Sequence, residues 1–210
     1  MIDFKQRWIR DWTSLGLTGD LDLLDRLLTS YAEPQRHYHT LQHLAECLDL
    51  FGQVAHLARH PGEAALALWF HDAVYISLAH DNEARSAAWA GEALQAAGAD
   101  EAVIAHTQAL IIATAHHQPE EGDARLVIDV DLAILGAEPT RFAEYEEQVR
   151  AEYATVPFEL YRHKRGELLA RFLERPAIYG TAELRAQLEE QARLNLRYAL
   201  ERLGAAQTDT

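Results

Sequence analysis

Apolar side chains recur at intervals of three and four residues along almost the whole chain, which is the spacing of an amphipathic α-helix. Ten segments follow this pattern: Phe4–Leu15, Leu21–Tyr31, Leu41–Leu57, Ala64–Val74, Ala84–Ala97, Val103–Ala115, Leu126–Leu135, Phe142–Tyr153, Leu160–Leu173 and Leu184–Leu203. Glycine and proline residues stand between the segments, where helices end. The one stretch with strand character, Arg125–Val130, continues with helical spacing. The pattern therefore predicts an all-α protein of about ten helices.

The 210 residues are enough to bury a substantial core. We expect a single all-α domain over residues 1–204 and a polar tail at 205–210. A membrane-spanning helix needs roughly 18 or more consecutive apolar residues, and no such run occurs. The first residues carry charges throughout and lack the apolar stretch of a secretion signal. These features indicate a soluble, cytoplasmic protein without a membrane partner.

The chain is acidic, with a formal net charge of −14 from 33 acidic and 19 basic residues. This balance argues against a nucleic-acid partner, because phosphate backbones bind to a basic face. A pocket for a small anion remains compatible with it. The lone cysteine, Cys47, can form neither an internal disulfide nor a CxxC zinc site, so we expect a reduced core residue.

The segment ALWFHDAVY, at 67–75, places a histidine and an aspartate among apolar residues. An ionised carboxylate such as Asp72 costs several kcal/mol in apolar surroundings unless it is paired or bound to a cation. A second apolar segment, VIDVDLAILG, contains Asp129 and Asp131. The chain also has eleven histidines, and several gather in RHYHTLQH at 36–43. This combination suggests a metal site, although a hydrogen-bonded polar cluster would also satisfy such groups.

Several familiar catalytic patterns are missing. Thr40 follows His39, so the HExxH zinc motif does not occur, and no histidine has a glutamate three residues before it, as ferritin-like di-iron sites require. GxSxG, P-loop and GxGxxG motifs are absent as well. What remains is a mixed site assembled from several helices, formed by His43, His71, Asp72 and Asp131. A divalent cation there would neutralise the two aspartates.

The order His, then His-Asp, then Asp resembles the HD superfamily of metal-dependent phosphohydrolases. More narrowly, it is similar to a branch of predicted HD phosphohydrolases of about this length. The segments that carry the resemblance are RHYHTLQH (36–43), WFHDAVY (69–75), DNEARSA (81–87), ATAHH (113–117), DVDLAILG (129–136) and VRAEY (149–153). A His-Asp pair alone is a weak signal, whereas this ordered set is specific. The resemblance implies one HD-like helical bundle.

The resemblance also assigns residues. It implies that the metal ligands are His43, His71, Asp72 and Asp131, with Asp131 chosen over Asp129 because it immediately precedes Leu132. It places His117 in the pocket. One departure concerns a second metal: two-metal relatives carry further histidines on the helix after the His-Asp pair, where this chain has Asn82 and Glu83.

The predicted function is metal-dependent hydrolysis of small phosphate esters, nucleotides among them. We expect Asp72, Glu83 and Arg36 to be catalytic, with Glu83 acting on water. Substrate contacts are expected from Arg36, His39, His117, Lys164 and Arg165, because guanidinium and ammonium groups bind phosphate. The histidine and carboxylate ligands favour Mn, Fe, Co, Ni or Zn over Mg.

Two alternatives stay open. One is a non-catalytic sensor that binds a nucleotide or a metal on the same scaffold. The other is a di-iron oxygenase with an HD fold, which needs additional ligands. The expected partner is a small phosphorylated substrate, and the sequence leaves the oligomeric state open.

Overall fold

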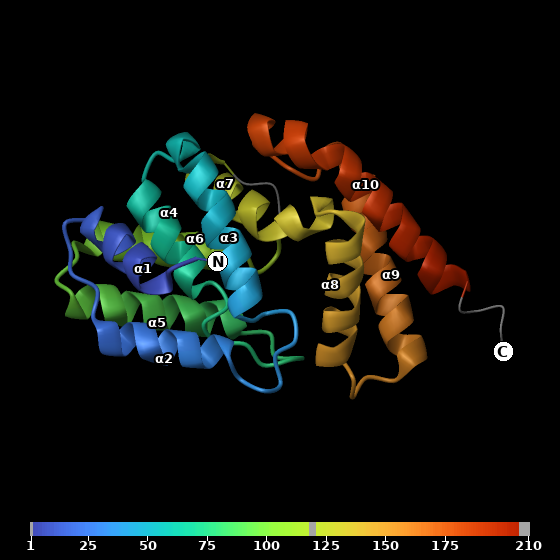
Figure 1. The fold of residues 1–210 in the computed structure, drawn as a ribbon, viewed down its shortest axis with the longest axis horizontal. Helices are drawn as coiled ribbons and strands as arrows, with labels where there is room; N and C mark the ends of the chain where they lie inside the picture. Colours follow the sequence, from blue (N-terminus) through green and yellow to red (C-terminus); the bar gives the residue numbers. More distant parts are fainter. Residues whose placement is uncertain (1, 118–120, 206–210) are drawn as a thin grey trace. The chain divides into compact units, whose positions relative to one another are not determined.

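The protein is described by a computed structural model that covers residues 2–117 and 121–205 (Figure 1). Over these residues it is all-helical, which confirms the predicted fold class. The ten α-helices are α1 (Phe4–Thr13), α2 (Leu21–Tyr31), α3 (Leu41–Val54), α4 (Pro61–Phe70), α5 (Asn82–Ala96), α6 (Glu101–Ala113), α7 (Gly122–Asp131), α8 (Pro139–Glu152), α9 (Phe158–Glu174) and α10 (Ala182–Ala205). Two short 3₁₀ helices, η1 (Ala55–Leu57) and η2 (Leu132–Gly136), extend α3 and α7.

The prediction was wrong at one helix end near the site. Helix α4 ends at Phe70 rather than Val74, so His71 and Asp72 lie in the turn after the helix. Helix α3 begins at Leu41 as predicted, and Thr40 caps it by accepting a hydrogen bond from the Gln42 N–H. Of the predicted polar tail, residue 205 ends α10 and residues 206–210 lie outside the described part.

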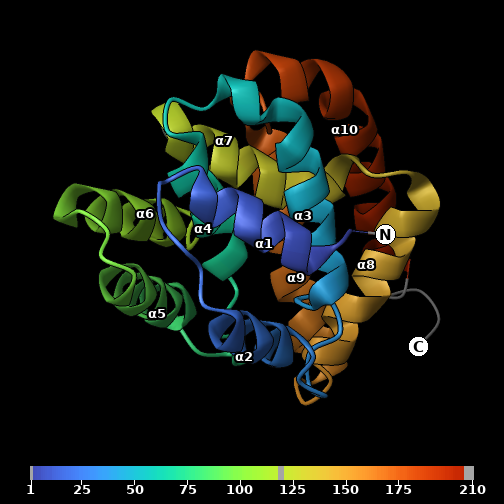
Figure 2. The ribbon, with the colours of Figure 1, turned by 60° about the vertical axis from the view of Figure 1, so that its left-hand side comes forward.

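The sequence predicts one domain over 1–204, and the structure groups these helices into two compact units, Met1–Asp131 and Leu132–Thr210. In the first unit, α4 is the central helix and packs against α1, α3, α5, α6 and α7. Every α4 residue from Gly62 to Phe70 is buried, as expected for a helix that is apolar on all sides. Helices α5 and α6 lie side by side (Figure 2).

Aromatic packing fixes the outer side of α4. Trp8 contacts Trp69 edge to face with ring centroids 5.1 Å apart, and it also packs on Trp12 at 5.2 Å. The Trp69 indole N–H donates to the Asp11 carboxylate over 3.0 Å, and Arg7 pairs with the same carboxylate at 2.7 Å. These contacts hold the last turn of α4 in place, and the His-Asp pair follows directly after it.

In the second unit, α10 packs along α9 and on η2. The Tyr179 hydroxyl donates to the Leu132 carbonyl, and the Asn195 amide donates to the carbonyls of Leu135 and Ala137. Gly136 allows a close approach here, because a Cβ atom at this position would lie 2.7 Å from Leu188 Cβ. In the described part of the chain, no helix combines the length and apolar character needed to cross a membrane.

Candidate metal centre

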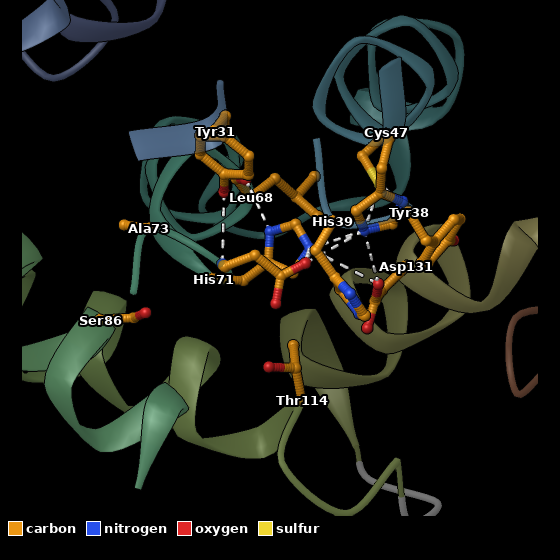
Figure 3. Close-up of polar contacts among 12 residues, drawn as sticks. Tyr31, Tyr38, His39, Cys47, Leu68, His71, Ala73, Ser86, Thr114 and Asp131 are labelled. Carbon is orange, nitrogen blue, oxygen red and sulfur yellow. Dashed lines mark hydrogen bonds and ion pairs between the residues drawn. The ribbon is translucent and has the colours of Figure 1, made fainter. Parts of the chain in front are cut away.

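Four of the predicted site residues come together inside the first unit, and Figure 3 labels two of them, His71 and Asp131. His43 lies in the first turn of α3, His71 and Asp72 follow the end of α4, and Asp131 is the last residue of α7. Both histidines are 1% exposed. The aspartate side chains are 15% and 12% exposed. The cluster is therefore largely buried, and its two carboxylates are its more exposed members.

The donor atoms of these residues face one another at short range. His43 Nε2 lies 3.0 Å from His71 Nε2, 3.3 Å from Asp72 Oδ2 and 3.2 Å from Asp131 Oδ1. His71 Nε2 lies 3.0 Å from Asp72 Oδ2 and 3.5 Å from Asp131 Oδ1. Each of the two histidine nitrogens thus has the other nitrogen and one oxygen of each aspartate within 3.5 Å.

This spacing fits a metal ion. Donors placed about 2.0–2.2 Å from a divalent transition metal and about 90–110° apart are roughly 3.0–3.5 Å from one another. The five separations above fall in this interval. The donor set also has the right chemistry, because two imidazoles and two carboxylates balance a divalent charge. His43, His71 and Asp131, together with Cys47, likewise form a cluster of mutually close donors that could hold an ion.

The pKa values of the cluster residues indicate which of them are charged when no ion is bound. Burial alone lowers the pKa of His71, but the Asp72 charge, Tyr31 and hydrogen bonds to both aspartates outweigh it, so the pKa lies well above 6.5. His43 follows the same pattern, with Cys47 and Tyr38 as the largest opposing influences on its pKa. Burial raises the pKa of Asp72, yet His71 and His39 hold it well below 3.8. Protonated imidazoles therefore compensate the carboxylates when no cation is bound.

The pKa of Asp131, at the end of α7, is lowered for similar reasons. Burial raises its pKa, and hydrogen bonds from His117, His43 and His71 bring it well below 3.8. Asp129, two residues earlier on the same helix, is also buried. Residues two apart on a helix point about 200° apart, so only one of the two aspartates can face this site. The site contains Asp131, as the sequence indicated.

A backbone contact fixes the tautomer of His71. Its Nδ1 lies 2.8 Å from the Leu68 carbonyl, which can only accept a hydrogen bond, so Nδ1 carries a proton. Nε2 is then left to act as the ligand atom, which is how metal-bound histidines are usually oriented. The Tyr31 hydroxyl donates to the Trp69 carbonyl and accepts from the Asp72 N–H. Figure 3 shows Tyr31 and Leu68 beside His71 on the side away from Asp131.

Arg36 was expected to bind the substrate, but its guanidinium contacts backbone carbonyls instead. Its guanidinium donates to the carbonyls of Asp72 at 2.6 Å, Ala73 at 3.0 Å and His39 at 3.3 Å, and pairs with the Glu33 carboxylate at 3.0 Å. The side chain is 1% exposed. Since its N–H groups point into the backbone of the turn, this placement does not support direct contact with a substrate phosphate. Arg36 instead fixes the turn that carries Asp72.

The rest of this turn is also held by side chains. The Val74 N–H donates to Ser86 Oγ at 3.0 Å, and the Asn82 amide forms hydrogen bonds with both the N–H and the carbonyl of Ile76. These partners replace the intrahelical hydrogen bonds that would have continued α4. Sequence periodicity could not detect this, because the partners lie on α5.

Cys47 adjoins the cluster, which we did not predict. It lies four residues after His43 on the same helix face, so the spacing in the sequence carries this signal. Its sulfur is almost equally distant from the two ring nitrogens of His43, 3.7 Å from Nδ1 and 3.8 Å from Nε2. If the Cys47 sulfur were a ligand of an ion bound to His43 Nε2, the sulfur would lie clearly nearer to Nε2 than to Nδ1. The Cys47 thiol instead packs beside the His43 ring. We therefore assign Asp72, rather than Cys47, as the fourth ligand.

His117 and His39 flank the cluster. His117 Nε2 lies 2.9 Å from Asp131 Oδ2, and its side chain is 34% exposed. His117 has a backbone φ of 47°, an unusual value for a residue with a side chain. The His39 ring stacks on Tyr75 with centroids 4.0 Å apart. Both predicted pocket histidines thus lie at the opening of the site.

The remaining predicted site residues are Glu83, Lys164 and Arg165. Glu83 is half-buried in the first turn of α5, and no hydrogen bond or ion pair connects it to the four donors. Lys164 and Arg165 belong to the second unit, where they pair with Glu167 at 3.0 Å and with Glu146, respectively. Their expected roles stay predictions.

Comparison with known proteins gives no further guidance. No family model, curated protein or solved structure matches the chain significantly. The function must therefore be argued from the site.

Proposed function

We propose that the protein is a metal-dependent hydrolase of small phosphate esters. The observation that carries this proposal is the buried pair His43 Nε2 and His71 Nε2, 3.0 Å apart, with carboxylate oxygens of Asp72 and Asp131 at 3.0–3.5 Å from both nitrogens. The resemblance of the chain to HD phosphohydrolases agrees with this donor order.

The donor set favours Mn, Fe, Co, Ni or Zn over Mg, since imidazole nitrogens suit transition metals. Four protein ligands leave open positions on an ion that accepts five or six. A divalent ion bound there supplies a water of lowered pKa and polarises a phosphoryl oxygen. The aspartate side chains are 12–15% exposed, so the open positions would face the solvent side.

The residues at the opening suit an anionic substrate. The imidazoles of His117 and His39 offer N–H donors, and His117 is oriented by Asp131 while His39 is oriented by stacking on Tyr75. With Arg36 occupied by the backbone, these histidines are the best-placed groups to bind phosphate oxygens and to hold a proton for the leaving group. Arg36 then acts as a positioning residue.

The overall charge restricts the substrate class. A chain of net charge −14 repels polyanions at long range, so a small phosphate ester, such as a nucleotide, is favoured over a nucleic acid. The oxygenase alternative needs ligands for a second iron. Asn82, which stands near the place of such a ligand in two-metal relatives, uses its side chain to bind the backbone of Ile76.

The proposal is tested with metal-free protein reloaded with Mn(II), Co(II) or Zn(II) and assayed on nucleotides, sugar phosphates and aryl phosphates. We expect metal-dependent phosphate release that is abolished in Asp72→Asn and retained in Asp129→Asn. Metal-loaded protein that hydrolyses none of these esters but binds one tightly would overturn the proposal in favour of the sensor.

A further inference from the structure

A carboxylate and a histidine form a hydrogen-bonded pair at the start of α4, whereas the His-Asp turn follows the end of this helix. Glu63 belongs to the first turn of α4, and His106 is on the neighbouring helix α6. His106 Nδ1 forms a hydrogen bond with the Glu63 carboxylate. Because a carboxylate accepts hydrogen bonds, Nδ1 is the donor. Neither residue takes part in the site described above.

This bond leaves Nε2 of His106 as the nitrogen that can accept a hydrogen bond. The two ring nitrogens of an imidazole point in widely different directions, so Nε2 is turned away from Glu63. The His106 side chain is 36% exposed, whereas the Glu63 side chain is 11% exposed. Within the described part of the chain, Glu63 is the only hydrogen-bond partner of the His106 ring. The buried carboxylate therefore orients an imidazole whose second nitrogen has no partner.

A pocket of about 600 Å³ opens beside this pair, and His106 is among the residues that line it. The apolar part of the lining comes from α6 and consists of Ala109, Leu110, Ile112 and Ala113. Pockets that bind small molecules combine such an apolar lining with a few polar groups, and this volume is in their usual range. The pocket can thus hold the apolar part of a small molecule while His106 accepts a hydrogen bond from its polar end.

The charges at this pocket favour a cationic ligand. Glu121 and Asp123 line the pocket and Glu63 contacts the lining residue His106, whereas Arg59 is the only arginine or lysine among the described lining residues. The Asp123 carboxylate accepts two backbone N–H groups at 2.7 and 2.8 Å, which fixes its position. The net charge of −14 also attracts cations to the protein at long range.

We propose that this pocket binds a small organic amine, with the ammonium group at His106 Nε2 and the apolar part against Leu110 and Ile112. An ammonium group has donors only, which matches an imidazole nitrogen that is oriented as an acceptor. A carboxylate or phosphate ligand has acceptors only, and the acidic side chains at the pocket would repel it. This site does not depend on the function proposed for the metal centre.

The test compares three compounds that share one apolar body, namely 2-phenylethylamine, 2-phenylethanol and 3-phenylpropionate, by calorimetric titration of the full-length protein. At about pH 8.5 a free imidazole is neutral and an alkyl amine is still largely charged. We expect the amine to bind about tenfold or more tightly than the alcohol, because a hydrogen bond to a charged group is the stronger one. The propionate should bind most weakly. Equal affinities of amine and alcohol, tighter binding of the propionate or no binding of the amine would each overturn the proposal.

Two substitutions of exposed residues locate the site. Ile112→Trp fills part of the pocket and should remove measurable amine binding, because the Ile112 side chain is 52% exposed and the larger ring has room to form. Ile9→Trp, at a residue of α1 that is 48% exposed, is the matched control and should bind like the wild type. Arg59→Gln removes the opposing positive charge and should strengthen amine binding by about two- to fivefold. Weaker amine binding in Arg59→Gln would contradict the predicted charge preference.

His106→Asn tests the acceptor directly and should weaken amine binding by about tenfold or more. Circular dichroism checks that this variant is folded, since it alters the partner of the buried Glu63 carboxylate. Amine affinity that is unchanged in a folded His106→Asn protein, or unchanged in Ile112→Trp, would overturn the proposal. The Ile112→Trp and Arg59→Gln comparisons decide the question even if His106→Asn does not fold.

Discussion

His43 Nε2 and His71 Nε2 lie 3.0 Å apart, although 28 residues separate them in the chain. Each nitrogen also faces carboxylate oxygens of Asp72 and Asp131. Two protonated imidazoles and two carboxylates have no net charge, and neither do two neutral imidazoles, two carboxylates and a divalent ion. The cluster can therefore exchange protons for a cation without leaving an uncompensated buried charge.

Metal binding should consequently release protons. The pKa values of His43 and His71 are raised above 6.5 in the ion-free protein, and a ligand imidazole must lose the Nε2 proton. Below these raised pKa values we expect the release of about two protons per ion and an affinity that rises with pH. Calorimetric titration with Zn(II) in buffers of different ionisation enthalpy measures this number. A buffer-independent enthalpy at pH 6 would contradict the exchange.

Whereas the metal affinity should rise with pH, the stability of the ion-free protein should fall as the two histidines lose their protons. The histidine pKa values are raised on folding, so their contribution is fully present below 6.5 and is lost as the pH rises through the raised values. The aspartate pKa values are lowered, so their contribution is present above 3.8 and is lost as the pH falls through the lowered values. Chelator-treated protein should thus show its highest melting temperature between about pH 4 and 6.5. A maximum above pH 8 would be inconsistent with this charge arrangement.

Asp131→Asn should abolish stabilisation by metal. A saturating ion, at about 100 times its Kd, stabilises the native state by roughly 2.7 kcal/mol, and the variant lacks one of the four donors. Thermal melting with and without Mn(II) or Zn(II) compares the two proteins. Asp129→Asn is the matched control, because it removes a neighbouring buried carboxylate from the same helix and should keep the metal-dependent gain. Equal gains in wild type and Asp131→Asn would show that Asp131 is not a ligand.

Arg36→Ala should lower the free energy of unfolding by about 2–4 kcal/mol, since it leaves the buried carbonyls of Asp72 and Ala73 without their donor. It should also weaken metal binding, because the turn that carries Asp72 loses its support. Arg85→Ala removes an exposed arginine of the same unit and should change stability by less than about 0.5 kcal/mol. Denaturant unfolding measures both. An Arg36→Ala protein of full stability and full metal affinity, but impaired turnover, would restore the phosphate-binding role expected from sequence.

The sequence predicted the helices well because each buries an apolar face with regular spacing, and this information is local. The candidate site came from a different argument: aspartates in apolar segments need a charge partner, and the resemblance to HD phosphohydrolases pointed to His43, His71, Asp72 and Asp131. The structure brings these four side chains together. The apolar spacing failed to predict the end of α4, where the decisive hydrogen bonds come from side chains outside that helix, namely Arg36, Ser86 and Asn82.

The role of Arg36 was missed for a related reason. A sequence shows that an arginine lies close to a candidate phosphate site, but it does not show whether backbone carbonyls already occupy the guanidinium.

A crystal structure of Mn(II)- or Zn(II)-soaked protein, with anomalous data collected at the metal edge, tests the central claim most directly. The account predicts an anomalous peak about 2.0–2.3 Å from His43 Nε2, His71 Nε2 and carboxylate oxygens of both Asp72 and Asp131. The four donors should shift by no more than a few tenths of an ångström, since they already face one point. A fully soaked crystal with no peak among these residues, and with His43 and His71 still bonded to the aspartates, would contradict it.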